Sequence, residues 1–174
     1  MKNMKVDKAS PEKRSDTYSQ VYIQIVFAVH GRQNFIKEHN REELQKYVTG
    51  LIQRRNQKLL AVYIMPDHVH LLIGLKPDIA VADLVRDIKS ISSQFISEKK
   101  WIPLKFNWQE GYGAFSYSKS QIDCVVKYIL NQGNHHHKRT FREEYIDFLE
   151  KFEIEFNEKY LFEWYDKQVA PPVL

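Results

Sequence analysis

Apolar and polar residues alternate along the segment from Tyr18 to Val29. One face of this segment carries only apolar side chains, namely Val21, Ile23, Ile25, Phe27 and Val29. A period of two is that of a strand with one face against a core. Two further apolar runs, Lys58 to Met65 and His68 to Leu75, are joined by Pro66-Asp67. Since this dipeptide is typical of tight turns, the two runs predict a hairpin.

Helical spacing of apolar residues follows the first strand and then the hairpin. It extends from about Asn40 to Ile52 and from Ile79 to Ser97. The aromatic- and glycine-rich stretch from Phe106 to Ser118 predicts a last strand with a bulge. A third helix is expected from Ser120 to Gly133. A fourth begins after Thr140, which forms a capping box with Glu143.

The order of these elements, βαββαβ followed by helices, predicts an α+β fold with a ferredoxin-like antiparallel sheet. We expect the helices to pack on one face of the sheet, and a tyrosine-bearing helix to follow the last strand. One domain is expected over residues 17–165. Residues 1–16 are expected to form a disordered basic arm, and residues 166–174 a loose tail.

Composition narrows the functional classes only slightly. The formal net charge of +4 and 13% aromatic residues favour a polyanionic partner such as nucleic acid. A single cysteine, Cys124, excludes an internal disulfide and favours a cytoplasmic location. No apolar run approaches the roughly 20 residues of a membrane-spanning helix, so no membrane partner is expected.

Two histidines interrupt the second strand of the predicted hairpin. His68 and His70 lie one residue apart in the run MPDHVHLLIGL and therefore point to the same side of the strand, with Val69, Leu71 and Ile73 on the core side. Imidazoles so placed are able to share one metal ion. Two half-buried histidines bonded to neighbouring groups explain the same pattern, and the spacing does not separate the two interpretations.

A tyrosine and a glutamine in the third helix fall outside its apolar stripe. The stripe is Ile122, Val125, Val126, Ile129 and Leu130, whereas Tyr128 and Gln132 share another flank one turn apart. Tyr128 is therefore either a surface tyrosine or a side chain presented for chemistry. A phenol becomes an effective nucleophile only beside a base or with a metal-activated electrophile.

The segments MPDHVHLLIGL, WQEGYGAFSYS and VVKYILNQ, in this order and spacing, resemble the single-tyrosine HUH transposases of the insertion sequence 200/605 family. The resemblance covers roughly Tyr18 to Trp164. It implies that His68 and His70 bind a divalent ion, Mg²⁺ or Mn²⁺, with Gln132 as a further ligand.

The same resemblance implies an enzyme that cleaves and rejoins single-stranded DNA at transposon-end hairpins. Tyr128 would be the nucleophile that forms a covalent 5′-phosphotyrosine, so rejoining needs no nucleotide cofactor. It also implies a homodimer, in which the tyrosine helix can serve the partner's metal site.

Basic and aromatic residues elsewhere are candidates for contacts with DNA. We expect such contacts from Arg54, Arg55, Arg86, Lys89, Tyr112, Lys138 and Arg139. Each basic pair is also compatible with an ordinary solvated surface. The tract His135–His137 is interpreted as part of a DNA-facing turn rather than a second metal site, because no matching ligand group is evident.

Three other functions remain open on the sequence alone. A domesticated relative that processes chromosomal palindromic repeats would use the same chemistry. A non-catalytic single-strand-binding module would not need the histidine pair, the tyrosine and the glutamine together. A phosphoesterase that uses water would form no covalent adduct.

Overall fold

The computed structural model describes residues 18–32, 35–103, 105–135 and 140–162. All of the predicted N-terminal arm and all of the predicted tail lie outside these ranges. Among the described residues, no helix combines the length and the apolar character that crossing a membrane requires.

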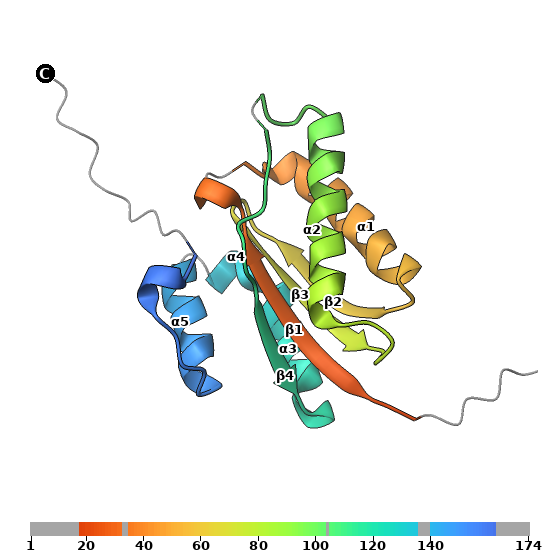
Figure 1. The fold of residues 1–174 in the computed structure, drawn as a ribbon, viewed down its shortest axis with the longest axis vertical. Coiled ribbons are helices and arrows are strands. Elements are labelled where there is room, and N and C mark those ends of the chain that lie inside the picture. Colours follow the sequence, from red (N-terminus) through yellow and green to blue (C-terminus); the bar gives the residue numbers. More distant parts are fainter. Residues whose placement is uncertain (1–17, 33–34, 104, 136–139, 163–174) are drawn as a thin grey trace, which may run out of the picture.

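An antiparallel sheet of four strands forms the centre of the fold (Figure 1). Its strands are β1 (Val21–Ala28), β2 (Lys58–Ile64), β3 (His68–Leu75) and β4 (Gly113–Tyr117), in the order β2-β3-β1-β4. β2 and β3 form the predicted hairpin, whose turn is closed by the Met65 amide donating to the His68 carbonyl at 2.8 Å. The order and orientation confirm the ferredoxin-like sheet.

The last strand is shorter than the sequence pattern predicted. Residues 105–112 form a loop along the end of β1, attached by an isolated bridge between Val29 and Trp108. The Gln109 amide also donates to the Ala28 carbonyl at 2.9 Å. Trp108 is held in the core, where its Nε1 donates to Ser92 Oγ at 2.9 Å, so its aromatic character serves packing.

One face of the sheet packs against the helices α1 (Glu38–Arg54) and α2 (Val81–Glu98). The sheet contributes Ile25, Phe27, Val29, Val69, Leu71 and Ile73 to this core. These are the residues whose alternation marked the core side in the sequence. The predicted strand faces are therefore correct for both β1 and β3.

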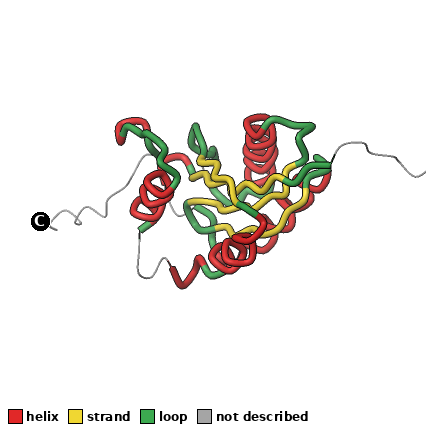
Figure 2. Tube along the Cα trace, turned by 90° about the horizontal axis from the view of Figure 1, so that it is seen from below, coloured by secondary structure: helices red, strands yellow, loops and turns green. Residues whose placement is uncertain are grey.

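The other face of the sheet is covered as well, which corrects the expectation that helices pack on one face only. The elements after β4 are α3 (Ile122–Leu130), α4 (Gln132–His135) and α5 (Phe141–Lys151), with short 3-10 turns at His30–Arg32, Lys119–Gln121 and Glu158–Tyr160. α3 packs on Tyr22, Ala61 and Leu72, and α5 packs on Val26, Ala28 and Phe115. In Figure 2 the strands lie between helices on either side.

α5 covers the sheet because most of its buried side chains are aromatic or aliphatic. Phe141, Tyr145 and Phe148 are all buried, and Phe115 of β4 stacks on Phe148 with 5.0 Å between ring centroids. Burying one such ring stabilises a fold by about 1.5–3 kcal/mol. The Thr140 hydroxyl accepts from the Glu143 amide and completes the predicted capping box.

Candidate active site

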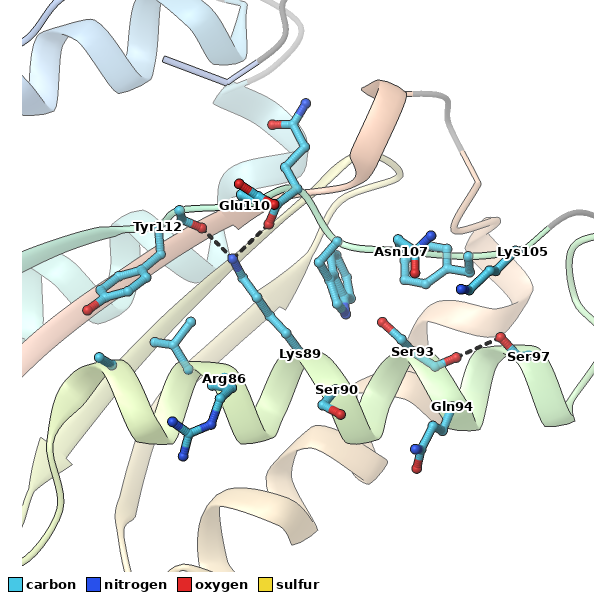
Figure 3. A pocket seen from close by; sticks show the side chains of 16 residues that line it. Arg86, Lys89, Ser90, Ser93, Gln94, Ser97, Lys105, Asn107, Glu110 and Tyr112 are labelled. Atoms are coloured by element: carbon cyan, nitrogen blue, oxygen red, sulfur yellow. Dashed lines mark hydrogen bonds between the residues drawn. The ribbon is translucent and has the colours of Figure 1, made fainter. Parts of the chain in front are cut away.

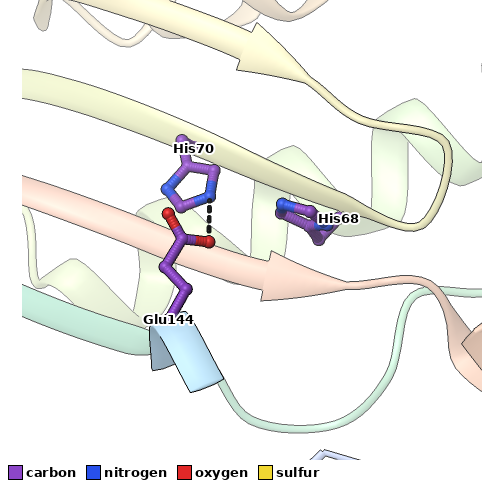
Figure 4. Close-up of side chains that lie close together, drawn as sticks. All are labelled: His68, His70 and Glu144. Carbon is purple, nitrogen blue, oxygen red and sulfur yellow. Dashed lines mark ion pairs between the residues drawn. The ribbon is translucent and has the colours of Figure 1, made fainter. Parts of the chain in front are cut away.

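The histidine pair lies beneath α5, not on an open surface. His68 and His70 are 1% and 0% exposed, and their ring centroids are 5.1 Å apart (Figure 4). They point away from the α1–α2 core, as the period of the strand requires. The Phe141 ring stacks on His68 with 4.0 Å between centroids. The imidazole nitrogens are therefore covered by α5 and not open to solvent.

Each imidazole is oriented by a neighbour through its Nδ1 atom. His68 Nδ1 lies 2.7 Å from Asp67 Oδ1, and His70 Nδ1 lies 3.2 Å from Gln24 Nε2. Nε2 is thus the nitrogen of each ring opposite to this contact, and for His70 it faces Glu144. Such outer contacts fix ring orientation in metal sites generally.

A carboxylate that the sequence analysis did not select completes the cluster. Glu144 of α5 is 4% exposed and points toward the histidines (Figure 4). Its Oε2 lies 3.4 Å from His70 Nε2, and one ligand atom from each of His68, His70 and Glu144 falls within 4.8 Å of the others. The signal was present in the sequence, since Glu144 is an acidic residue three positions after Phe141 and four before Phe148 on an aromatic stripe.

Tyr128 lies inside this cluster and is not a surface residue. It is half-buried in α3, its ring packs edge-on against Phe148 at 5.9 Å, and its hydroxyl donates to Glu144 Oε1. Burial, reinforced by the negative charge of Glu144, raises the pKa of the Tyr128 phenol well above its usual range. The phenol is therefore held protonated, with a carboxylate already bound to its proton.

Gln132 reaches the same carboxylate from a different helix. α3 ends at Leu130 and Gln132 begins α4, so the predicted continuous helix through Gly133 is wrong. Gln132 is fully buried, and its Nε2 donates to Glu144 Oε1 at 2.7 Å. Its Oε1 has no hydrogen-bond partner among the described residues. A buried, unpaired amide oxygen is costly, and it is an oxygen donor suited to a hard divalent cation.

The donor set as a whole fits a divalent metal ion. Two imidazoles and a carboxylate, all buried and mutually close, match the ligand types of such ions. The geometry brings together His68, His70, Tyr128 and Gln132, the four predicted site residues, around the unpredicted Glu144.

Three of the residues predicted to contact nucleic acid line one groove on the opposite face of the molecule. The groove, about 740 Å³ in volume, lies between α2 and the 105–112 loop and includes Arg86, Lys89 and Tyr112 (Figure 3). Lys89 Nζ donates to the carbonyl oxygens of Gln109 and Gly111 and so ties the loop to α2. Burial lowers the pKa of Lys89 to about 8, against the opposing effect of Glu110.

The remaining basic candidates are not part of this groove. Arg54 and Arg55 lie at the end of α1, and Arg55 forms an ion pair with Asp87 at 2.6 Å. Lys138 and Arg139, like His136 and His137, lie outside the described residues.

Known structures share this fold. A crystal structure of a Deinococcus radiodurans protein provisionally assigned as a transposase matches with a TM-score of 0.56 and 21% identity, covering 70% of this chain and 97% of that one. A REP-associated tyrosine transposase solved bound to a REP hairpin matches with a TM-score of 0.53 and 16% identity, covering 95% of this chain and 99% of that one. The fold is thus one found among DNA transposases.

Sequence comparison identifies the family. The family model for IS200-like transposases matches residues 17–132. The ISDra2 transposase TnpA of Deinococcus radiodurans is 24% identical over 120 residues, which cover 65% of this chain and 84% of that protein. The chain belongs to the IS200-like transposases, as the resemblance predicted. The family match ends at Gln132, so α5 and its Glu144 lie beyond it.

Proposed function

We propose that this transposase cleaves and rejoins single-stranded DNA, with Tyr128 as the nucleophile and a divalent ion bound by His68, His70 and Glu144. The observation that carries the proposal is the meeting of the tyrosine hydroxyl and the histidine pair at one buried carboxylate. Gln132 would add its Oε1 as a further ligand. Mg²⁺ and Mn²⁺ are the proposed ions, because both accept carboxylate and amide oxygens.

The chemistry is a transfer of one phosphodiester bond. The Tyr128 oxygen attacks phosphorus, the bond to the 3′ oxygen breaks, and the DNA strand beyond the cut stays attached through its 5′ phosphate. The phenol proton passes to the Glu144 carboxylate that already accepts it, and the released 3′ oxygen takes up a proton from water to become a hydroxyl. A bound ion would neutralise charge on the phosphate as a Lewis acid. Because the phosphotyrosine keeps the phosphodiester energy, the reverse attack by a 3′ hydroxyl rejoins DNA without a nucleotide cofactor.

The proposed substrate is a single strand that carries a hairpin. The basic balance of the chain and the solved relative bound to a REP hairpin both support it. We expect the protein to bind such a strand more tightly than a blunt duplex of the same sequence. Affinity should fall steeply with salt, since phosphate contacts release counterions.

Fluorescence anisotropy with hairpin, linear and duplex DNA measures this preference, and a cleavage assay on the same strands tests for enzymatic activity.

The variants Arg86→Ala and Tyr112→Leu test whether the groove between α2 and the 105–112 loop binds DNA. The matched control is Lys46→Ala, on the exposed side of α1. Equal or tighter binding to the blunt duplex would contradict the single-strand preference. Binding without any cleavage would favour the non-catalytic module, and cleavage without a protein-bound product would favour a phosphoesterase.

Processing of dispersed chromosomal palindromes is the second candidate function. The likeness to the REP-associated transposase extends over 95% of this chain, whereas the Deinococcus structure covers 70%. The fold likeness to the REP-associated protein therefore takes in more of this chain than the family match over residues 17–132. The DNA around the gene separates the two candidates: paired terminal palindromes indicate a mobile element, and repeats scattered through the genome indicate the domesticated role.

We also propose a homodimer in the cytoplasm. The dimer rests on the family resemblance, and the location on a chain whose one cysteine, Cys124, forms no internal disulfide. Light scattering at tens of micromolar should give twice the 20.8 kDa chain mass. A monomer at that concentration would contradict the dimer. Cleavage would remain feasible in a monomer, since Tyr128 and His70 of one chain meet at the same carboxylate.

A further inference from the structure

A buried side-chain amide of β1 contacts one histidine of the pair. Gln24 of β1 is 0% exposed. Its Nε2 lies 3.2 Å from His70 Nδ1, and its Oε1 accepts a hydrogen bond of 2.9 Å from the Tyr117 hydroxyl of β4. Tyr117, Gln24 and His70 thus form a hydrogen-bonded chain across three adjacent strands, β4, β1 and β3, that ends at the proposed metal site.

This hydrogen-bonded chain has to be compatible with two neutral tautomers of His70. In the structure the amide donates to Nδ1, so the neutral imidazole carries its hydrogen on Nε2, beside Glu144 Oε2 at 3.4 Å. A metal ion at Nε2 requires the other tautomer, in which Nδ1–H is a donor. A fixed donor at the position of Gln24 would oppose that change.

Gln24 and Tyr117 are able to accommodate both forms. If the amide turns by half a rotation, its Oε1 accepts from Nδ1–H and its Nε2 donates to the Tyr117 oxygen. A phenol hydroxyl donates in the first arrangement and accepts in the second. Burial raises the pKa of Tyr117 to about 12, so the hydroxyl keeps its proton at neutral pH. In both arrangements the Gln24 amide therefore keeps one hydrogen bond to His70 Nδ1 and one to the Tyr117 oxygen.

We propose that Gln24, supported by Tyr117, is a positioning residue that turns its amide to select the His70 tautomer required for metal binding. The proposal rests on the proposed function for its metal ion. It adds a role for β1 and β4, which contribute no proposed ligand to the metal site.

Three variants test the role. Gln24→Leu keeps the volume but loses both hydrogen bonds. Gln24→Glu keeps an acceptor for Nδ1–H, which is the arrangement of the metal-bound form. Tyr117→Phe removes only the hydroxyl. The matched controls are Gln45→Leu, which makes the same exchange on α1, and Tyr145→Phe, which removes a phenol hydroxyl on α5.

Two measurements without DNA distinguish positioning from mere support of the fold. Calorimetric titration with Mn²⁺ should show affinity about 10- to 100-fold weaker for Gln24→Leu, as for other residues that orient a metal ligand. Tyr117→Phe should weaken it several-fold, while Gln24→Glu and both controls stay within about threefold of wild type. Nitrogen NMR of the His70 ring, recorded with diamagnetic Mg²⁺ in place of Mn²⁺, should show Nδ1–H when wild type and Gln24→Glu bind metal, and the Nε2–H form in metal-free wild type.

The results of these measurements distinguish a failure of the Gln24 positioning role from a failure of the proposed metal centre. Mn²⁺ affinity of Gln24→Leu within threefold of wild type, or a His70 tautomer that does not change on metal binding, overturns the positioning role. If wild type binds no Mn²⁺, the proposed metal centre fails instead. The metal-free NMR spectrum then still tests the contact, because an unchanged His70 ring in Gln24→Leu would show that Gln24 does not control its tautomer.

Discussion

A Tyr128→Phe variant should bind metal and hairpin DNA but form no covalent adduct. The exchange removes only the hydroxyl that donates to Glu144 Oε1. Gln132 still donates to that oxygen at 2.7 Å, so the carboxylate keeps a partner. We therefore expect the free energy of unfolding to fall by about 1.5–3 kcal/mol, the range for one hydrogen bond to a charged group.

The measurement is a denaturing gel of protein incubated with 3′-labelled DNA and Mg²⁺ or Mn²⁺. Wild type should carry the label on the protein band, because the strand beyond the cut remains attached through its 5′ phosphate. Tyr47→Phe, in α1 on the far side of the sheet, should retain the band. A labelled band in Tyr128→Phe means that another residue is the nucleophile.

A His68→Ala variant should lose metal-dependent cleavage altogether. The imidazole is one of the two nitrogen donors of the cluster, and its loss should weaken metal binding by more than about 100-fold, beyond the effect of removing an outer contact. Because His68 is fully buried against Phe141, the variant should also lose about 1–3 kcal/mol of stability.

Cleavage is therefore compared at a temperature where circular dichroism shows both proteins folded. His39→Ala is the matched control, since His39 is an exposed histidine of α1 remote in sequence from the cluster. Undiminished cleavage by His68→Ala at limiting metal would falsify the assignment of this ligand.

Strand faces were predictable because their period is set by the backbone. The alternation in β1 and the spacing of His68 and His70 place these side chains correctly without knowledge of any partner. The position of Tyr128 off the apolar stripe of α3 was also meaningful. A second packing partner, α5, accounts for it, because Tyr128 contacts Phe148 and Glu144 there.

Neither the packing of α5 over the histidine pair nor the position of Glu144 beside it was predicted from the sequence. The aromatic stripe of α5 is visible in the sequence. Such a stripe indicates that one face of the helix is buried, but it does not indicate which element packs against that face. The sequence assigned a role only to the neighbouring Glu143, which forms the capping box with Thr140. The break at Asn131 was missed because Gly133 was taken as the end of the helix, although an asparagine can also end one.

β1 should tolerate insertions poorly. Both faces of this strand are buried. Ile25 and Phe27 point into the α1–α2 core, while Gln24 and Val26 face the histidine cluster and α5. Adding one residue before Ile23 would exchange these faces over the rest of the strand. The amide would then be buried among aliphatic side chains, and an isoleucine would stand behind His70. We therefore expect natural relatives to differ in length at the turns and termini while this strand keeps a constant length.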